Sequence, residues 1–168
     1  ATGMELTSVD SKKLIAALEG HPTESRGRMM HELFYKRKFL FHWGGLADGG
    51  DNFELKNGIG YEIMSALGDL NYPTLFSTKG ANTFLNKKYV DLFSRHAKQA
   101  NFAFQVSMVS NDEKMAAKVE VGVPPPKRRM EMIREYSRMG YWTILRLRPY
   151  IIGVSDESID SLLEDAFD

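Results

Sequence analysis

Four short polar stretches of this sequence could do chemistry, because each one follows directly on an apolar run. They are "GGLADGGD" at 44–51, "STKG" at 77–80, "SMVS" at 107–110 and "RPYIIGVSD" at 148–156. Glycine lets a backbone approach a ligand closely, a carboxylate accepts hydrogen bonds from an ammonium group, and lysine or serine can meet a carboxylate or a hydroxyl. If the four stretches share one end of a sheet, they predict a single ligand site.

The apolar runs that precede these stretches are typical of β-strands, at residues 39–43, 73–78, 102–107 and 142–147. The first, "FLFHW", is continuously apolar, which predicts a strand covered on both faces. The segments between these runs have apolar residues at helical spacing, which predicts helices. Two helices, or one broken helix, are predicted before the first run. This alternation predicts an α/β fold with parallel strands, either a doubly wound sheet or part of a (βα) barrel.

The chain has the length of one domain, and we expect a single unit over residues 1–168. Within it, N-terminal helices would span 1–38 and four βα units would span 39–168. A chain of 168 residues with 43% hydrophobic content can bury about two-thirds of its unfolded surface. In parallel α/β folds the loops converge at the carboxyl ends of the strands, so the ligand site is expected there.

Composition excludes several classes of function. Lys and Arg number 22, as do Asp and Glu, so no long-range field attracts the chain to nucleic acid or to an anionic membrane. No apolar run approaches the roughly 20 residues of a membrane helix, and the first residues lack the pattern of a signal peptide. We expect a soluble, cytoplasmic protein with no membrane partner. The absence of cysteine excludes disulfides and thiolate metal sites, and the four histidines lack zinc-site spacing, so no metal is expected.

A basic cluster, "PKRRMEMIR" at 126–134, contains Lys127 and three arginines that could meet phosphate. Glu131 and Glu135 are interleaved with these cations. We therefore expect a solvated helix face rather than a nucleic-acid site.

Together these stretches resemble the radical S-adenosylmethionine enzymes, and within them the spore photoproduct lyase-like, or DNA repair photolyase, branch. The resemblance covers about residues 37–166. "RKFLFHWGGLAD" is similar to the branch's second barrel strand with its Gly-Gly-x-x-Asp motif, "PTLFSTKG" to its third strand, and "FQVSMVS" to its fourth. "VEVGVPPPKRRMEMI" resembles the family's Glu-Pro-Gly-x-Pro-x-x-x-x-Arg segment, and "GYWTILRLRPYIIGVSD" its fifth strand. The resemblance implies an incomplete TIM-like (βα) barrel and a structural pair between Glu120 and Arg129.

The resemblance also implies a site for S-adenosylmethionine at the carboxyl ends of the strands. Its residues would be Gly44, Gly45, Asp48, Thr78, Lys79, Ser107, Arg146 and Ile152. The Gly44–Gly45 carbonyls and Asp48 would hold the methionine ammonium group. Ser107 would lie near the ribose or the carboxylate, and Ile152 near the adenine. The branch has Pro after this Asp, whereas Gly49–Gly50 follows here, which predicts a looser and less preorganised loop.

Radical chemistry in this family needs a [4Fe–4S] cluster held by Cys-x3-Cys-x2-Cys, and this sequence has no cysteine. Two hypotheses therefore stay open. The chain is a fragment of a radical S-adenosylmethionine enzyme, inactive by itself, with the cluster present only if its parent protein has the motif upstream. Its substrate would be unknown, with nucleic acid implied by the resemblance alone, and no catalytic residue is identified.

The other hypothesis is a cluster-less α/β module that binds a nucleotide-like ligand or a protein partner. Under both hypotheses the sheet would have two unpaired edges, which could support self-association.

Overall fold

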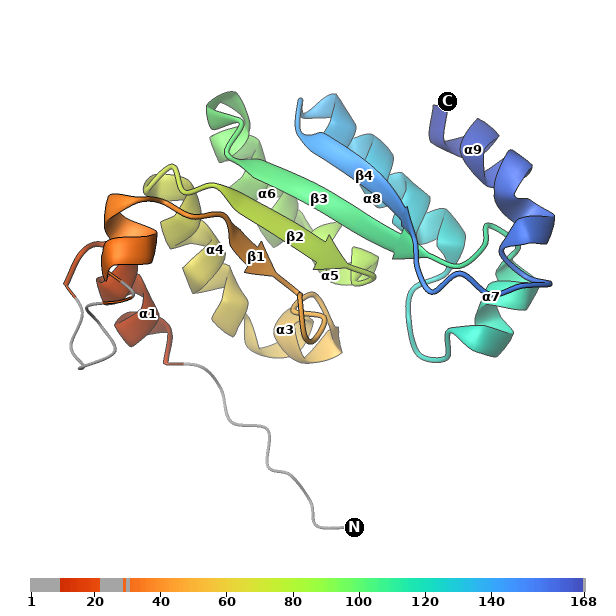
Figure 1. Ribbon diagram of the computed structural model, residues 1–168, viewed down its shortest axis with the longest axis horizontal. Coiled ribbons are helices and arrows are strands. Elements are labelled where there is room, and N and C mark those ends of the chain that lie inside the picture. Colours follow the sequence, from red (N-terminus) through yellow and green to blue (C-terminus); the bar gives the residue numbers. More distant parts are fainter. Residues whose placement is uncertain (1–9, 22–28, 30, 168) are drawn as a thin grey trace, which may run out of the picture.

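The computed structural model describes residues 10–21, 29 and 31–167. It contains one four-stranded sheet made of β1 (Phe41–Trp43), β2 (Thr74–Thr78), β3 (Phe102–Met108) and β4 (Trp142–Leu147). The strands lie in the order β1-β2-β3-β4, and each neighbouring pair is parallel (Figure 1). The four predicted strands are present, with bounds that differ by at most two residues, and their parallel direction is confirmed.

Helices precede β1, fill the connections between the strands and follow β4. They are α1 (Ser11–Leu18), η1 (His31–Lys36), α3 (Asn52–Asn57), α4 (Ile59–Asp69), α5 (Ala81–Phe84), α6 (Lys87–His96), η2 (Ala97–Gln99), α7 (Glu113–Val119), α8 (Pro126–Arg138), η3 (Asp156–Ser158) and α9 (Ile159–Phe167). Local chemistry sets several of their ends. Asp51 caps α3 by accepting hydrogen bonds from two backbone N–H groups, and Pro126 begins α8 at a position where its missing N–H costs nothing.

The helices cover one face of the sheet. Figure 1 shows α4, α6 and α8 on the same side of the strands. Phe76, Phe104 and Val106 point into this helical layer and are fully buried. The strand order follows the chain without reversal, so the described sheet is not doubly wound.

No helix among the described residues covers the opposite face of the sheet, and we call it the open face. It carries alternate strand residues, including His42, Gln105 and Trp142, and the Trp142 side chain is 79% exposed. The prediction that the first strand is covered on both faces is wrong. The strand is short and lies at the edge of the sheet, and Phe39 and Leu40 precede it with half or more of their surface exposed.

Closely packed aromatic rings form the core between the sheet and its helices. The ring of Phe104 lies with its centroid 4.2 Å from that of Tyr136 and 5.1 Å from that of Phe76. The Tyr136 hydroxyl donates to the Phe84 carbonyl at 2.8 Å, so this buried phenol has a partner. The core thus holds the strands rigidly on one side only. Within the described residues, no helix is both long and apolar enough to cross a membrane.

Candidate ligand-binding site

A cavity of about 420 Å³ lies at the carboxyl ends of the strands, within the size range of small-molecule sites. Residues from the exits of all four strands line it. Most of the residues predicted for the site are among them: Gly44, Gly45, Asp48, Thr78, Lys79, Ser107 and Arg146. The convergence follows from the parallel order of the strands, which brings all their carboxyl ends to one edge.

Ile152, the remaining predicted residue, does not line this cavity. Its side chain is 86% exposed, because it lies at the tip of a turn. In that turn the Ile151 carbonyl accepts hydrogen bonds from the N–H groups of Val154 and Ser155. This hydrogen-bonded turn after β4 leaves Ile152 exposed to solvent.

Gly44 is glycine because the end of β1 passes against the end of β2. Its φ is +87°, in the left-handed region, and a Cβ at this position would overlap the Ser77 carbonyl oxygen. The residue therefore serves the contact between two strands as well as lining the cavity. This contact explains why the apolar run stops at a glycine.

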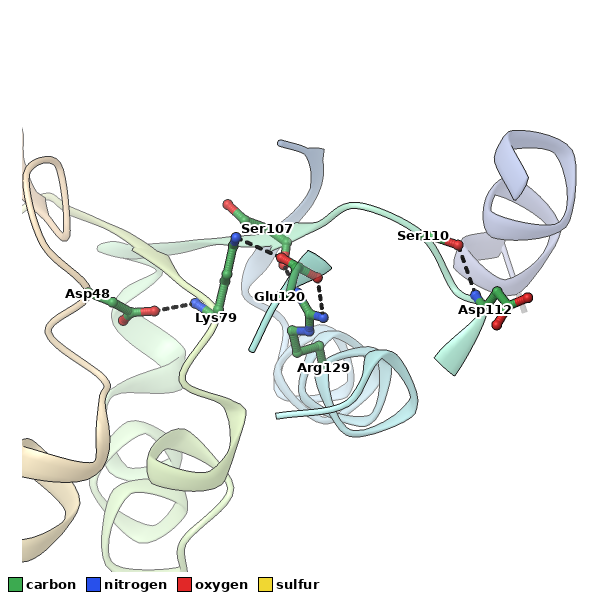
Figure 2. Close-up of polar contacts among 7 residues, drawn as sticks. All are labelled: Asp48, Lys79, Ser107, Ser110, Asp112, Glu120 and Arg129. Atoms are coloured by element: carbon green, nitrogen blue, oxygen red, sulfur yellow. Dashed lines mark hydrogen bonds and ion pairs between the residues drawn. The ribbon is translucent and has the colours of Figure 1, made fainter. Parts of the chain in front are cut away.

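Asp48 ties the loop after β1 to the loop after β2. Its Oδ1 accepts from the Gly50 N–H at 2.9 Å and from the Thr78 hydroxyl at 2.6 Å, and its Oδ2 accepts from the Lys79 N–H at 2.6 Å. The last of these bonds is drawn in Figure 2. A carboxylate offers about four acceptor positions, so roughly one position is left for a ligand donor. The carboxylate is mainly an organiser of the site.

The Gly49–Gly50 segment is packed, whereas the sequence predicted a loose loop. A Cβ on Gly50 would lie 2.8 Å from the Thr78 hydroxyl oxygen and 2.5 Å from a ring carbon of Phe84. Gly49 lies against the indole of Trp43 in the same way. The two glycines let this loop pack closely against aromatic side chains.

Lys79, Glu120 and Arg129 form a buried ionic network beside the cavity (Figure 2). The Lys79 Nζ lies 2.6 Å from Glu120 Oε1, and the Arg129 guanidinium donates to Glu120 Oε2 at 2.6 Å. Arg129 also donates to the Ser107 carbonyl at 2.8 Å. The structure thus pairs Glu120 with Arg129, and the network fixes the ends of β2 and β3 relative to α8. The Lys79 ammonium points to Glu120, so it is less available to a ligand than the sequence suggested.

The environment of Glu120 favours its charged form. Burial by itself would raise the pKa of this carboxyl, but hydrogen bonds from Arg129 and Lys79 outweigh that effect and hold the pKa below its ordinary value. The Arg129 side chain is fully buried, and that of Glu120 is 3% exposed. Two cations surround one carboxylate, which leaves a net positive charge at this side of the cavity.

Three side chains that the sequence reasoning missed, those of His42, Ser77 and Gln105, join the predicted Arg146 in a hydrogen-bonded row across the open face, and we call these four residues the polar row. The His42 Nε2 lies 2.7 Å from the Ser77 Oγ, which donates to Gln105 Oε1 at 2.9 Å. Arg146 donates to the same oxygen at 3.3 Å. Each strand contributes one member. The signal was present in the sequence, because each polar residue alternates with core-facing residues at a period of two.

Two arginines give the cavity its positive character. Arg146 and Arg148 both line it, and no carboxylate among the described residues forms a salt bridge with either guanidinium. A guanidinium offers a planar set of donors that suits carboxylate and phosphate. The site therefore favours an anionic ligand.

The basic cluster of α8 does not form a phosphate site. Arg129 is buried in the ionic network, and Arg128 pairs with Glu131 at 2.6 Å. Arg134 donates to the Asp165 carbonyl at 3.0 Å. These contacts assign the arginines to intramolecular roles.

Comparison with known proteins gave no relatives: no family model matches the chain, and neither curated proteins nor solved structures match it significantly. The described residues also contain no group of three or more His, Asp or Glu side chains placed to hold a metal ion.

Proposed function

We propose that this chain binds S-adenosylmethionine in the cavity at the carboxyl ends of its strands, as part of a radical S-adenosylmethionine-type (βα) barrel. The observation that carries the proposal is the convergence of all four strand exits on one cavity, with two arginines that form no salt bridge to any carboxylate in the described part of the chain. A sheet whose strands follow chain order, with helices on one face, is the arrangement of a barrel segment.

The residues present suit both ends of the methionine group. Arg146 and Arg148 can bind its carboxylate, and the remaining acceptor position on Asp48 can take one ammonium hydrogen. Ser107 lines the same cavity and offers a hydroxyl to a ribose. Asp48 is already used by three donors, so we expect weak binding.

The residues do not suit an iron–sulfur cluster. The sequence has no cysteine thiolate, which is the ligand that such clusters require. In the resembled family the cluster supplies the electron for cleavage of S-adenosylmethionine. Any thiolates for it would have to come from outside this sequence, so the chain by itself is proposed to bind the ligand without cleaving it.

Calorimetric titration tests the proposal. Wild-type protein should bind S-adenosylmethionine saturably with low affinity, and the double variant Arg146→Met/Arg148→Met should bind at least about tenfold more weakly, because two charge-assisted contacts are lost. Arg138→Met, which changes an exposed arginine at the last turn of α8, is the matched control and should bind as the wild type does. Absence of saturable binding, or equal binding by the double variant, would contradict the proposal.

A second candidate is a module that binds a nucleotide-like ligand through its phosphate. The observation in its favour is the same pair of arginines, together with the near-complete use of Asp48 by the protein itself. Titration with adenosine diphosphate distinguishes the two. Tighter binding of the diphosphate than of S-adenosylmethionine would favour this candidate.

A further inference from the structure

The polar row connects the four strands by hydrogen bonds and so constrains where its protons lie. Arg146 lies at one end of the polar row, and its guanidinium can only donate hydrogen bonds. Its NH1 group lies 3.3 Å from the side-chain oxygen of Gln105. If the Gln105 amide were turned over, its own NH2 group would face the guanidinium, and two donors would meet without an acceptor. Arg146 therefore selects the orientation with the Gln105 oxygen facing both Arg146 and Ser77.

The orientation of Gln105 fixes the hydroxyl of Ser77. A carbonyl oxygen can only accept, so Ser77 gives its single hydroxyl hydrogen to Gln105 Oε1, at 2.9 Å. The Ser77 oxygen is then an acceptor toward its other neighbour, the His42 Nε2 at 2.7 Å. Nε2 must carry the hydrogen of that bond. A neutral imidazole has one N–H, so the other nitrogen, Nδ1, is unprotonated.

Nδ1 of His42 is open to a ligand. His42 lines the cavity, and no described residue donates a hydrogen bond to this nitrogen. Gly45 keeps the space beside it clear, since a Cβ there would lie 3.3 Å from Nδ1. The lone pair of Nδ1 can therefore accept a hydrogen bond from an N–H or O–H group of a ligand in the cavity.

We infer that the polar row holds His42 as its Nε2–H tautomer and makes Nδ1 the hydrogen-bond acceptor for an N–H or O–H group of the cavity's ligand. The part of this inference that concerns the ligand, namely that Nδ1 accepts a hydrogen bond from it, rests on the proposed function; we call this part the ligand half. The chemical class it defines is a small molecule with an anionic group for Arg146 and Arg148 and a hydroxyl or ammonium donor close to that group. The methionine group and the ribose of S-adenosylmethionine both provide such donors.

Nuclear magnetic resonance of protein labelled with ¹⁵N-histidine tests the tautomer without any ligand. With the imidazole neutral, the Nδ1 resonance of His42, assigned with a His42→Gln variant, should lie in the unprotonated range. In Arg146→Met the Gln105 amide is free to turn over, so the Nδ1 resonance should shift toward the protonated range. Arg148→Met removes a cavity arginine that does not contact Gln105 and should leave the resonance in place. A protonated Nδ1 in the wild type, or no shift in Arg146→Met, overturns the inference.

Addition of S-adenosylmethionine to the same sample tests the ligand half. Binding should move the His42 Nδ1 resonance, and Gly45→Ala, which crowds this nitrogen, should weaken the binding while the tautomer stays the same. If S-adenosylmethionine binds and the Nδ1 resonance does not move, the inference is overturned and the proposed function stands. Suppose that the ligand-free protein has the expected tautomer but no protein resonance responds to S-adenosylmethionine at any concentration. The proposed function and the role of Nδ1 as acceptor for this ligand are then both wrong, whereas the assignment of the His42 tautomer holds.

Discussion

The two faces of the sheet are built from the same strands but carry different kinds of residue. On the helix-covered face Phe76, Phe104 and Met108 are fully buried and contact other aromatic or apolar side chains. On the open face the strands carry the polar row near their carboxyl ends and the exposed Trp142 at the amino end of β4. Stability therefore lies on one face, and the recognition chemistry lies on the other face and along its carboxyl edge.

The difference between the two faces shows how a sheet covered by helices on one face can position a polar site on the other. A sheet buried on both faces would have to bury His42, Gln105 and Arg146 at a cost of several kcal/mol unless all were fully paired. The open face removes that cost, because solvent reaches these side chains. The aromatic core on the other side holds their backbone in place, and this rigidity is what makes the polar row geometrically definite.

Truncating the core should produce the largest effect. Phe104→Ala should reduce the free energy of unfolding by about 4 kcal/mol, because the ring is fully buried among other rings and leaves a cavity. Ile144→Ala, on the open face of the neighbouring strand, should cost about 1 kcal/mol or less, since that side chain is 38% exposed. Urea unfolding followed by circular dichroism measures both. Equal losses would mean that the two faces do not differ as described.

The buried ionic network should show the next largest effect. Arg129→Met should cost roughly 3 kcal/mol, because it leaves Glu120 buried with only Lys79 as an ionic partner. Lys127→Met, two residues earlier in α8 and exposed, is the control and should change stability by less than about 0.5 kcal/mol. Chemical denaturation of both variants gives the comparison. A loss of less than 1 kcal/mol for Arg129→Met would show that the network does not anchor α8 to the sheet.

Gly44→Ala should cost about 2 kcal/mol, because it adds a Cβ against the Ser77 carbonyl in a left-handed conformation. Gly140→Ala is a control for the conformation alone. Its φ of +91° is close to the +87° of Gly44, but a Cβ there meets nothing within 4 Å. The control should cost about 1 kcal/mol. The difference between the two melting or denaturation curves isolates the contact between β1 and β2, and no difference would contradict that contact.

The decrease in the free energy of unfolding at acid pH should depend in part on Glu120. Its pKa is lowered in the folded state, so it stabilises the fold above the unfolded-state value of about 4.5, and this contribution is lost as the pH falls from about 4.5 through the folded pKa. In that range the loss from one carboxyl is at most about 1.4 kcal/mol per pH unit. Glu120→Gln should flatten the pH dependence of unfolding below pH 4.5. An unchanged slope would mean that Glu120 titrates alike in the folded and unfolded states.

Much of the fold could be predicted from the sequence, because period-two and helical patterns are local. The strand positions, their parallel order and the polar character of their exits all follow from such patterns. Coverage of β1 could not be predicted this way. "FLFHW" is apolar apart from His42, yet whether a second helical layer exists depends on tertiary packing, which no local pattern encodes.

The sequence predicted the location of the candidate site better than it predicted the role of each residue there. Glycines and carboxylates at strand exits indicated the cavity, but the same residue types also bind other parts of the protein. Asp48 and Lys79 were expected to meet a ligand, and their strongest contacts are with neighbouring loops and with Glu120. His42 and Gln105 were missed, because their role depends on neighbours that lie 35 and 41 positions away along the chain.

Changing Trp142 should have the smallest effect on stability and still test the open face. The side chain is 79% exposed, so Trp142→Ser should change the free energy of unfolding by less than about 0.5 kcal/mol.

β1 and β4 are the edges of the sheet, and unpaired edges beside exposed apolar side chains favour association between chains. Sedimentation velocity should therefore show concentration-dependent self-association of the wild type that is reduced in Trp142→Ser. Val121→Ser is the control, since that side chain is similarly exposed, at 85%, but lies between α7 and α8, outside the strands, and its substitution should leave association unchanged. A wild-type protein that stays monomeric at every concentration would show that the open face is a ligand surface alone, and equal loss of association in both variants would point to general surface hydrophobicity instead of this face.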